Sequence, residues 1–288
     1  MSYGLSCRLI ATDLDGTLLR DDKTVSQRTR AALAAAQAAG IIVVLVTARP
    51  PRVAREIAAL LATGTTVDTV NTRGTPHAHP AHELAICCNG ALVYDLTHDT
   101  IAQHDPLTAD DAARIVRELR LRAPGVAFAC EQGLRFGCEP AWRAQSVATR
   151  ADDDAHIADA LTLCREPVTK LIARHPALTM DALQALAEQA AGATAHVTQS
   201  GANFIELSAP NVDKAWALAR LCAAQDIEPA RVIAFGDMPN DIPMLRWAGR
   251  GVAVANAHAD ALASADEATA SNNDDGVAIV IERLLASE

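Results

Sequence analysis

Two aspartates one residue apart, Asp13 and Asp15, follow a short apolar run and precede Gly16. The apolar run predicts a buried strand, and side chains two apart in an extended chain share a face. Gly16 lets the chain turn away and leave that face open. Carboxylate oxygens are ligands that Mg²⁺ prefers, and it usually adds waters and substrate phosphate oxygens. The pair therefore predicts a cation site, although a simple Asp-Gly turn at a strand end is also common.

A second acidic segment lies far along the chain, where Asp237 and Asp241 follow the apolar run at residues 231–235. If the strands before these two segments lie in one sheet, four carboxylates meet at one edge of that sheet and repel each other. Their pKa values would then rise unless a cation lay among them. Lys214 and Thr47 are the candidates to bind the outer oxygens of a phosphoryl group. Phosphoryl transfer depends on such positioning and charge neutralisation.

The elements that must position these residues follow from the apolar pattern. A helix over residues 26–39, with Ser26 as its N-cap and Gly40 as its stop, separates the first strand from a β-branched strand at 41–46. A βαβ unit of this kind is right-handed and parallel, so both strands end at the same edge of the sheet. Thr47 is therefore expected near Asp13.

The rest of the chain divides into a continuation of this α/β pattern and an insert. Before the insert, the α/β pattern continues with a helix at 52–61, a strand at 84–88, a turn at Asn89-Gly90 and a strand at 91–95. After the insert, it resumes with a helix at 212–225, strands at 231–235 and 251–255, and a helix at 277–286. Residues 96–208 predict an α+β insert with helices at 109–122, 152–163 and 178–191 and strands at 126–129, 134–136, 168–174, 193–198 and 203–208. We expect an α/β, Rossmann-like core of residues 1–95 and 209–288 with a parallel sheet, and an inserted α+β cap domain at 96–208.

Composition narrows the class of protein. Half of the 288 residues are apolar, and no run of about 18 apolar residues occurs, so we expect a soluble cytoplasmic protein with no membrane partner. The net charge of −10 argues against nucleic acid, and the seven scattered cysteines are expected to be buried apolar residues. A His-containing connector at residues 63–83 is expected to be a solvated loop rather than a metal site.

The motifs together resemble the haloacid dehalogenase (HAD) superfamily. The matching residues, in family order, are Asp13-Leu14-Asp15-Gly16-Thr17-Leu18-Leu19, Thr47, Lys214 and Gly236-Asp237-Met238-Pro239-Asn240-Asp241. The insert between Thr47 and Lys214 resembles the Cof-type subfamily with a C2B cap. Further similarity lies at Asn89-Gly90-Ala91, Val168-Thr169-Lys170-Leu171 and the tail from Gly251. Departures from the usual glycines are Ala48, Asn211 and Ala255.

The resemblance implies roles that the residues alone leave open. Asp13 would be the nucleophile that forms an aspartyl-phosphate, and Asp15 would be general acid and then general base. Thr47 and Lys214 would bind the phosphoryl group. Mg²⁺ would be held by a set drawn from Asp13, Asp15 (through its backbone carbonyl), Asp237 and Asp241, with Asn240 and Asp241 supporting the site.

The substrate is expected to be a small phosphorylated metabolite, such as a sugar phosphate, and the protein a monomer or homodimer. In the core, the candidate substrate-binding residues are Arg49, Asn89 and Asn240. In the cap they are Glu131, Arg135, Glu139 and Lys170, each of which taken singly is more commonly a solvated charge.

Three other functions compete with a Mg²⁺-dependent phosphatase. A phosphomutase of the same superfamily would share Asp13 and Asp15 and return the phosphoryl group. A dehalogenase is disfavoured because it needs neither a metal nor a second aspartate at position 15. A non-catalytic metabolite-binding module would leave the retained acidic residues unexplained.

Overall fold

The computed structural model describes residues 7–63, 84–145 and 154–287. The chain forms two compact units, Met1–Thr100 with Lys214–Glu288, and Ile101–Asp213. Each limit of the inserted unit lies five residues beyond the limit expected from the sequence (101 against 96, and 213 against 208). In the described part of the chain, no helix is both long and apolar enough to cross a membrane.

The first unit is built on a sheet whose strand order is β14-β13-β12-β1-β2-β3-β4-β5, and the chain passes into the second unit within β5, after Thr100. Every pair from β14 to β3 is parallel, and β3 and β4 are antiparallel. The strands are β1 (Leu9–Thr12), β2 (Ile42–Val46), β3 (Leu84–Cys87), β4 (Leu92–Asp95), β5 (Thr100–His104), β12 (Val232–Gly236), β13 (Arg250–Val254) and β14 (Glu267–Thr269). The mostly parallel sheet confirms the predicted Rossmann-like class.

Strand β1 lies at the centre of this sheet, and Leu9 is in register with Ile42 of β2 and with Val232 of β12. All four β1 residues are buried, as expected of an apolar strand covered on both faces. The chain leaves β1 toward β2 on one side and returns through β12 on the other. Ligands bind at the carboxyl ends of strands where the strand order reverses in this way. Asp13 directly follows β1, and Asp237 directly follows β12.

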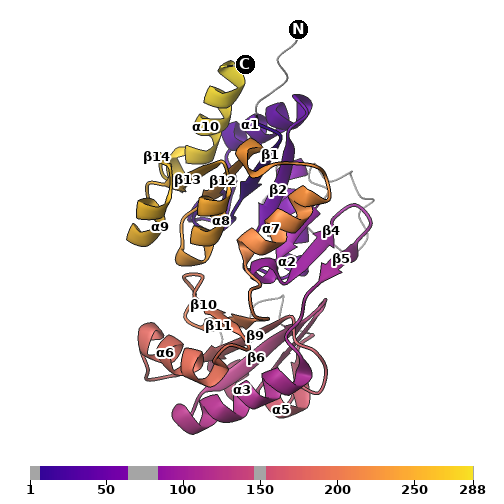
Figure 1. Ribbon diagram of the computed structural model, residues 1–288, viewed down its shortest axis with the longest axis vertical. Coiled ribbons are helices and arrows are strands. Elements are labelled where there is room, and N and C mark those ends of the chain that lie inside the picture. Colours follow the sequence, from indigo (N-terminus) through magenta and orange to yellow (C-terminus); the bar gives the residue numbers. More distant parts are fainter. Residues whose placement is uncertain (1–6, 64–83, 146–153, 288) are drawn as a thin grey trace. The chain divides into compact units, whose positions relative to one another are not determined.

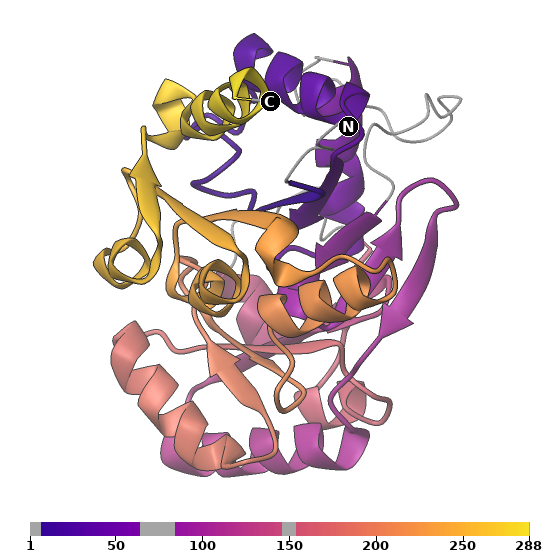
Figure 2. The ribbon, with the colours of Figure 1, turned by 45° about the horizontal axis from the view of Figure 1, so that its top comes forward.

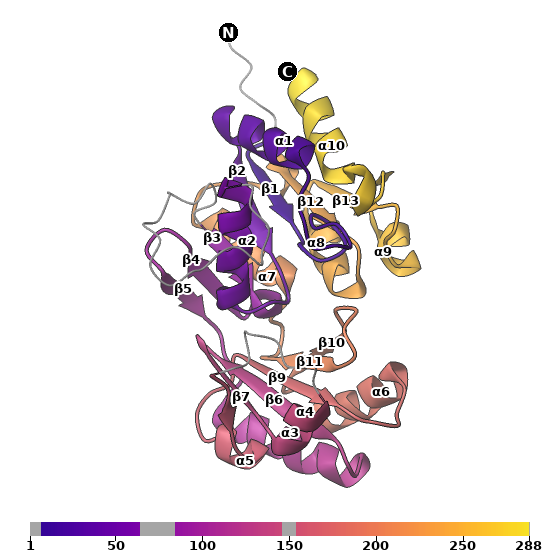
Figure 3. The same cartoon turned by 180° about the vertical axis from the view of Figure 1, so that it is seen from behind.

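Helices cover both faces of the first sheet. Figures 1 and 3 show α7 and α8 on one face and α2 on the other, and Figure 2 shows α1 alongside α10. Side chains of α7 and α8, including Leu218 and Leu245, pack with Leu9 and Val44 of the sheet in one apolar core. The helices are α1 (Gln27–Ala38), α2 (Pro51–Thr63), α7 (Lys214–Ala223), α8 (Ile242–Trp247), α9 (Ala259–Ser264) and α10 (Gly276–Ala286).

The second unit has its own six-stranded sheet, ordered β10-β11-β9-β6-β7-β8. Helices α3 and α6 pack on one face over Phe128 and Leu171, and Trp142 of α4 packs with Ala129 and Ile172 on the other. The strands are β6 (Ala127–Gln132), β7 (Arg135–Cys138), β8 (His156–Ile157), β9 (Lys170–Arg174), β10 (His196–Thr198) and β11 (Ile205–Ser208). The helices are α3 (Ala109–Arg122), α4 (Pro140–Gln145), α5 (Ala160–Leu163) and α6 (Met180–Ala191).

The helix predicted over residues 152–163 is correct only at its end, where Ala160–Leu163 form α5, and is wrong at residues 156–157. His156 and Ile157 form β8 and pair in parallel with Gly137 and Cys138. Asp159 caps the short helix α5, because its side chain accepts a hydrogen bond from the Leu161 backbone N–H. Strands β5 and β14 were not anticipated, and the predicted loop at 63–83 lies outside the described residues apart from Thr63, the last residue of α2.

Candidate active site

Asp13 lies directly after β1 with its backbone N–H bonded to the Phe235 carbonyl, 3.0 Å away. Lys214, the first residue of α7, donates from Nζ to Asp13 Oδ1 at 2.6 Å and to Asp241 Oδ1 at 2.5 Å. Lys214 is only 1% exposed, and Asp241 is fully buried. Burial alone would lower the pKa of Lys214, but the charges of Asp13 and then Asp241 outweigh burial and raise it. Lys214 is therefore a buried cation that joins two carboxylates.

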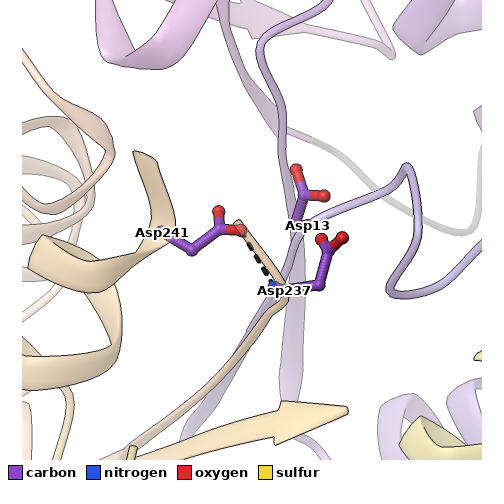
Figure 4. Close-up of side chains that lie close together, drawn as sticks. All are labelled: Asp13, Asp237 and Asp241. Carbon is purple, nitrogen blue, oxygen red and sulfur yellow. Dashed lines mark hydrogen bonds between the residues drawn. The ribbon is translucent and has the colours of Figure 1, made fainter. Parts of the chain in front are cut away.

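The second oxygen of Asp241 organises the acidic loop after β12. Asp241 Oδ2 accepts hydrogen bonds from the backbone nitrogens of Asp237 at 3.0 Å and Met238 at 2.9 Å, the first of which Figure 4 shows. A Cβ on Gly236 would lie 2.5 Å from the Asp241 Cβ, so only glycine fits there. Both Asp241 oxygens thus accept hydrogen bonds that orient Lys214 and the loop, and the predicted role of this carboxylate as a metal ligand stays a prediction.

Asp237 is held by the loop that follows Asp15. Thr17 Oγ1 donates to Asp237 Oδ1 at 2.8 Å, and the His258 N–H donates to the Asp237 carbonyl at 2.8 Å. Gly16 has a φ of 76°, and a Cβ at this position would collide with Asp237 Oδ2. A larger residue at position 16 would therefore be strained twice, by its backbone and by this contact.

The donor atoms of these residues fit a divalent cation. One carboxylate oxygen each from Asp13, Asp237 and Asp241 lies within 4.8 Å of the others (Figure 4). Within the described residues, Asp13 Oδ2 and Asp237 Oδ2 accept no hydrogen bond. Burial, and then the charge of Asp241, raises the pKa of Asp237 to about 6, and burial also raises the pKa of Asp13 despite Lys214. Three carboxylates against one ammonium leave negative charge for a cation to neutralise.

The Asp15 carboxylate is not part of this cluster. Arg49 binds it with two nitrogens, Nε on Oδ2 and Nη2 on Oδ1 at 2.6 Å, and Lys23 Nζ lies 3.0 Å from Oδ1. Burial would raise the pKa of Asp15, but its bonds to Arg49 and Lys23 outweigh burial and lower it. Asp15 is therefore anionic and its side chain is engaged by two cations, while the metal ligand predicted at this position is its backbone carbonyl.

Thr47 and Asn89 lie where β2 and β3 end. The buried Thr47 hydroxyl accepts a hydrogen bond from the Arg49 backbone N–H at 3.1 Å, and its carbonyl accepts one from Asn89 N–H at 3.1 Å. The Asn89 side chain accepts a bond from Asn240 Nδ2 at 3.0 Å. This pair joins two residues predicted separately as substrate-binding, and no sequence signal indicated that they would be in contact.

The candidate residues of the second unit have different surroundings. Lys170 Nζ lies 2.5 Å from Glu206 Oε1, both side chains are buried, and Glu131 is in register with Lys170 on the neighbouring strand. These residues alternate with the side chains that face α3 and α6, so they lie on the opposite face of the sheet.

Arg135 is exposed, whereas Glu139 is buried among backbone donors. Arg135 pairs with Glu166, and both side chains are well exposed. Glu139 accepts bonds from the backbone nitrogens of Phe128 at 2.8 Å and Ala160 at 3.2 Å, which makes it a structural residue of this unit. Sequence spacing could not distinguish these two residues from Glu131 and Lys170.

A parallel sheet with buried aspartates and a lysine at its switch point, and with an inserted α+β unit, defines the class of HAD-type hydrolases. The family model of the haloacid dehalogenase-like hydrolases matches residues 10–281, and the chain belongs to this family. It is a phosphoric monoester hydrolase by class.

Relatives of similar length match nearly the whole chain. The chain is 26% identical over 274 residues to the 5-amino-6-(5-phospho-D-ribitylamino)uracil phosphatase YcsE of Bacillus subtilis, covering 95% of this chain and 94% of the relative. It is 28% identical to the pyridoxal phosphate phosphatase YbhA of Escherichia coli, covering 95% and 97%. The HAD subclass IIB sugar phosphatase BT4131 superposes with a TM-score of 0.79 at 18% identity, covering 96% and 98%, which shows a shared fold.

Proposed function

We propose that this protein is a Mg²⁺-dependent phosphatase that hydrolyses a small phosphorylated metabolite through an aspartyl-phosphate on Asp13. The observation that carries the proposal is the cluster of Asp13, Asp237 and Asp241 at the carboxyl ends of β1 and β12, with the Lys214 ammonium paired to Asp13 and Asp241. The full-length relatives with phosphatase activity support the reaction class.

Asp13 would be the nucleophile. One Asp13 oxygen attacks the phosphorus while the bond from phosphorus to the leaving oxygen breaks, which transfers the phosphoryl group to the carboxylate. Water then attacks the same phosphorus, the bond to the Asp13 oxygen breaks, and phosphate leaves. Lys214, already beside Asp13 Oδ1, and the buried Thr47 would bind the outer phosphoryl oxygens.

Asp15 would protonate the leaving oxygen and later accept a proton from the attacking water. In the present arrangement Asp15 is an anion held by Arg49 and Lys23. Proton donation therefore requires Asp15 to give up at least part of these contacts and to take up a proton from solvent when substrate binds. Arg49 is then free to bind the negatively charged phosphoryl group, as expected for a guanidinium next to an anion.

Asp13 and Asp237 would hold the Mg²⁺ through the carboxylate oxygens that accept no hydrogen bond in the described structure, with the Asp15 backbone carbonyl as a third ligand. When bound, Mg²⁺ would neutralise charge on the phosphoryl oxygens. Asp241 would keep Lys214 and the loop backbone in place rather than bind the ion.

The leaving group would be selected by the inserted unit as a cap. Glu131 and Lys170 are the favoured specificity residues because they lie on one sheet face, whereas Arg135 is an exposed ion-pair residue. The substrate is expected to be a sugar phosphate or similar phosphomonoester, and a cytoplasmic location stays a prediction.

The test is a screen of phosphorylated metabolites with purified protein and Mg²⁺, in which released phosphate is measured. The Asp13→Asn variant, prepared in parallel, controls for contaminating phosphatases. Phosphate release by the wild type but not by this variant would support the proposal, and equal release by both would contradict it.

A further inference from the structure

Asn240 presents a buried polar atom that no described residue satisfies. Its Nδ2 donates to Asn89 Oδ1 at 3.0 Å, while its own Oδ1 is buried and has no hydrogen-bond partner in the described part of the chain. The Asn240 residue is 7% exposed. Buried polar atoms are nearly always paired, so this acceptor at the edge of the site calls for a donor other than the described residues, such as a water or a bound ligand.

The direction of this orphaned atom is set by Asn89. Asn89 has a left-handed backbone, with φ 56° and ψ 31°, which asparagine tolerates better than most residues. Its N–H is bonded to the Thr47 carbonyl, and the preceding Cys88 N–H is bonded to the Arg49 carbonyl at 3.0 Å. Asn89 is therefore fixed to the loop that carries Thr47. Because Asn89 Oδ1 accepts from the Asn240 amide nitrogen, the Asn240 oxygen must point the other way.

The chemistry of the missing partner follows from the atom it must satisfy. A carbonyl oxygen accepts hydrogen bonds and cannot bind another acceptor. The oxygens of a phosphate monoester dianion are acceptors, so they cannot pair with Asn240 Oδ1. An O–H or N–H group can. Asn240 directly precedes Asp241 and lies three residues after Asp237, so the candidate donors include the O–H groups of water around a bound cation and of a substrate hydroxyl.

We propose that Asn89 is a positioning residue that orients the Asn240 amide so that Asn240 Oδ1 accepts a hydrogen bond from an O–H donor of the bound ligands. The inference rests on the proposed function for the identity of those ligands. It assigns Asn89 an indirect role and gives Asn240 a task distinct from binding the phosphoryl oxygens.

Two substitutions at position 89 separate this role from a purely conformational one. Asn89→Gly keeps the freedom to adopt the left-handed backbone but removes the acceptor for Asn240. Asn89→Asp tolerates the same backbone and keeps an acceptor oxygen, so it should still orient Asn240. Its added negative charge should attract a cation rather than repel it. Asn240→Ala removes the oriented amide itself. It replaces Asn89→Gly as the test variant if Asn89→Gly does not fold.

The first readout is Mn²⁺ affinity, measured by electron paramagnetic resonance without substrate. The second is the ratio of kcat/KM for glycerol 3-phosphate to that for propyl phosphate, which differ only in hydroxyl groups. If the donor is metal-bound water, Asn89→Gly and Asn240→Ala weaken Mn²⁺ binding about ten- to hundredfold, as outer ligand partners commonly do, while Asn89→Asp stays near the wild type. If the donor is a substrate hydroxyl, Mn²⁺ affinity holds and the kcat/KM ratio falls in the same two variants.

Wild-type values for Asn89→Gly in both readouts would overturn the inference. Equal damage in Asn89→Asp and Asn89→Gly would also overturn it, because the retained acceptor would then have no effect. A wild-type protein that hydrolyses neither ester would count against the proposed function, and the Mn²⁺ titration would then decide on Asn89 alone.

Discussion

Lys214 Nζ lies 2.6 Å from Asp13 Oδ1, although 201 residues separate the two in the chain. The buried Lys214 ammonium therefore forms an ion pair with Asp13, the carboxylate proposed to attack phosphorus. A lysine here can neutralise Asp13 before substrate arrives and then share its charge with the phosphoryl oxygens. The same ammonium also binds Asp241, so it has a structural role as well as a proposed catalytic one.

We expect Lys214→Met to lose turnover and stability together. The variant leaves Asp13 and Asp241 buried without their cation, and removing one partner of a buried ion pair commonly costs about 3–5 kcal/mol. Its urea midpoint in EDTA should therefore fall. Adding Asp241→Asn should recover part of the loss because it removes one unpaired charge. A single variant as stable as the wild type would mean that Lys214 is not needed to compensate these carboxylates.

Asp13→Asn is expected to abolish turnover while the protein stays folded. An amide has nearly the same shape as the carboxylate but is a poor nucleophile, so the rate should fall at least about a thousandfold. Circular dichroism should still show cooperative unfolding. Turnover at the wild-type rate in this variant would move the nucleophile to another residue.

Metal dependence and pH dependence should be linked through Asp237. Activity should disappear in EDTA and return with Mg²⁺, because buried carboxylates need a compensating cation. The pKa of Asp237 is raised to about 6 by burial and then by the charge of Asp241. Protons should therefore compete with Mg²⁺ as the pH falls through about 6, so the Mg²⁺ concentration for half activation should rise. Full turnover in EDTA would exclude a metal role.

The same pKa shift predicts a stability difference between wild type and Asp237→Asn without metal. The folded state binds this proton more tightly than the unfolded state, so the charged form destabilises the wild type above about pH 6. Asp237→Asn should be more stable there, by up to about 3 kcal/mol, and its advantage should shrink as the pH falls toward the unfolded pKa. Saturating Mg²⁺ should make the wild type the more stable of the two proteins, because Mg²⁺ binds the wild type better than the variant. Parallel urea curves across pH measure this difference.

The core of the fold could be predicted because its signals are local. Ser26 and the helix α1 behind it, and the β-branched strand β2, follow directly from capping and apolar runs. The meeting of Asp13 with Asp237 also follows, because parallel strands deliver their ends to one edge. The polar stretch at β8 was misjudged because its structure depends on pairing with the distant strand β7.

The pairing of site residues could not be predicted because it depends on side-chain direction. Asp13, Asp15 and Asp241 have identical side chains but different partners. Asp15 is bound by Arg49 and Lys23. Asp241 is bound by Lys214 and by the backbone of its own loop. Asn211, which replaces a glycine usual in the family, adopts a φ of 62°. Asparagine accepts this left-handed backbone, so the departure leaves the approach to Lys214 feasible.

We expect Asp15→Asn to be impaired to a degree that depends on the leaving group. A sugar phosphate expels a poor alkoxide that needs a proton in the first step, whereas p-nitrophenyl phosphate expels a stable phenolate that needs it far less. The ratio of wild-type to variant rate for aspartyl-phosphate formation should therefore be larger for the sugar phosphate.

Pre-steady-state burst measurements must accompany this comparison, because both substrates pass through the same aspartyl-phosphate. If water attack limits turnover, the steady-state ratios converge even when Asp15 is the general acid. Arg49→Met is the matched control: it removes the guanidinium that lowers the pKa of Asp15 but retains the carboxylate, so its burst rates should keep the leaving-group dependence of the wild type. Equal first-step ratios for the two substrates in Asp15→Asn would leave Asp15 without a role as general acid, and only its backbone carbonyl would then remain as a candidate contribution to the site.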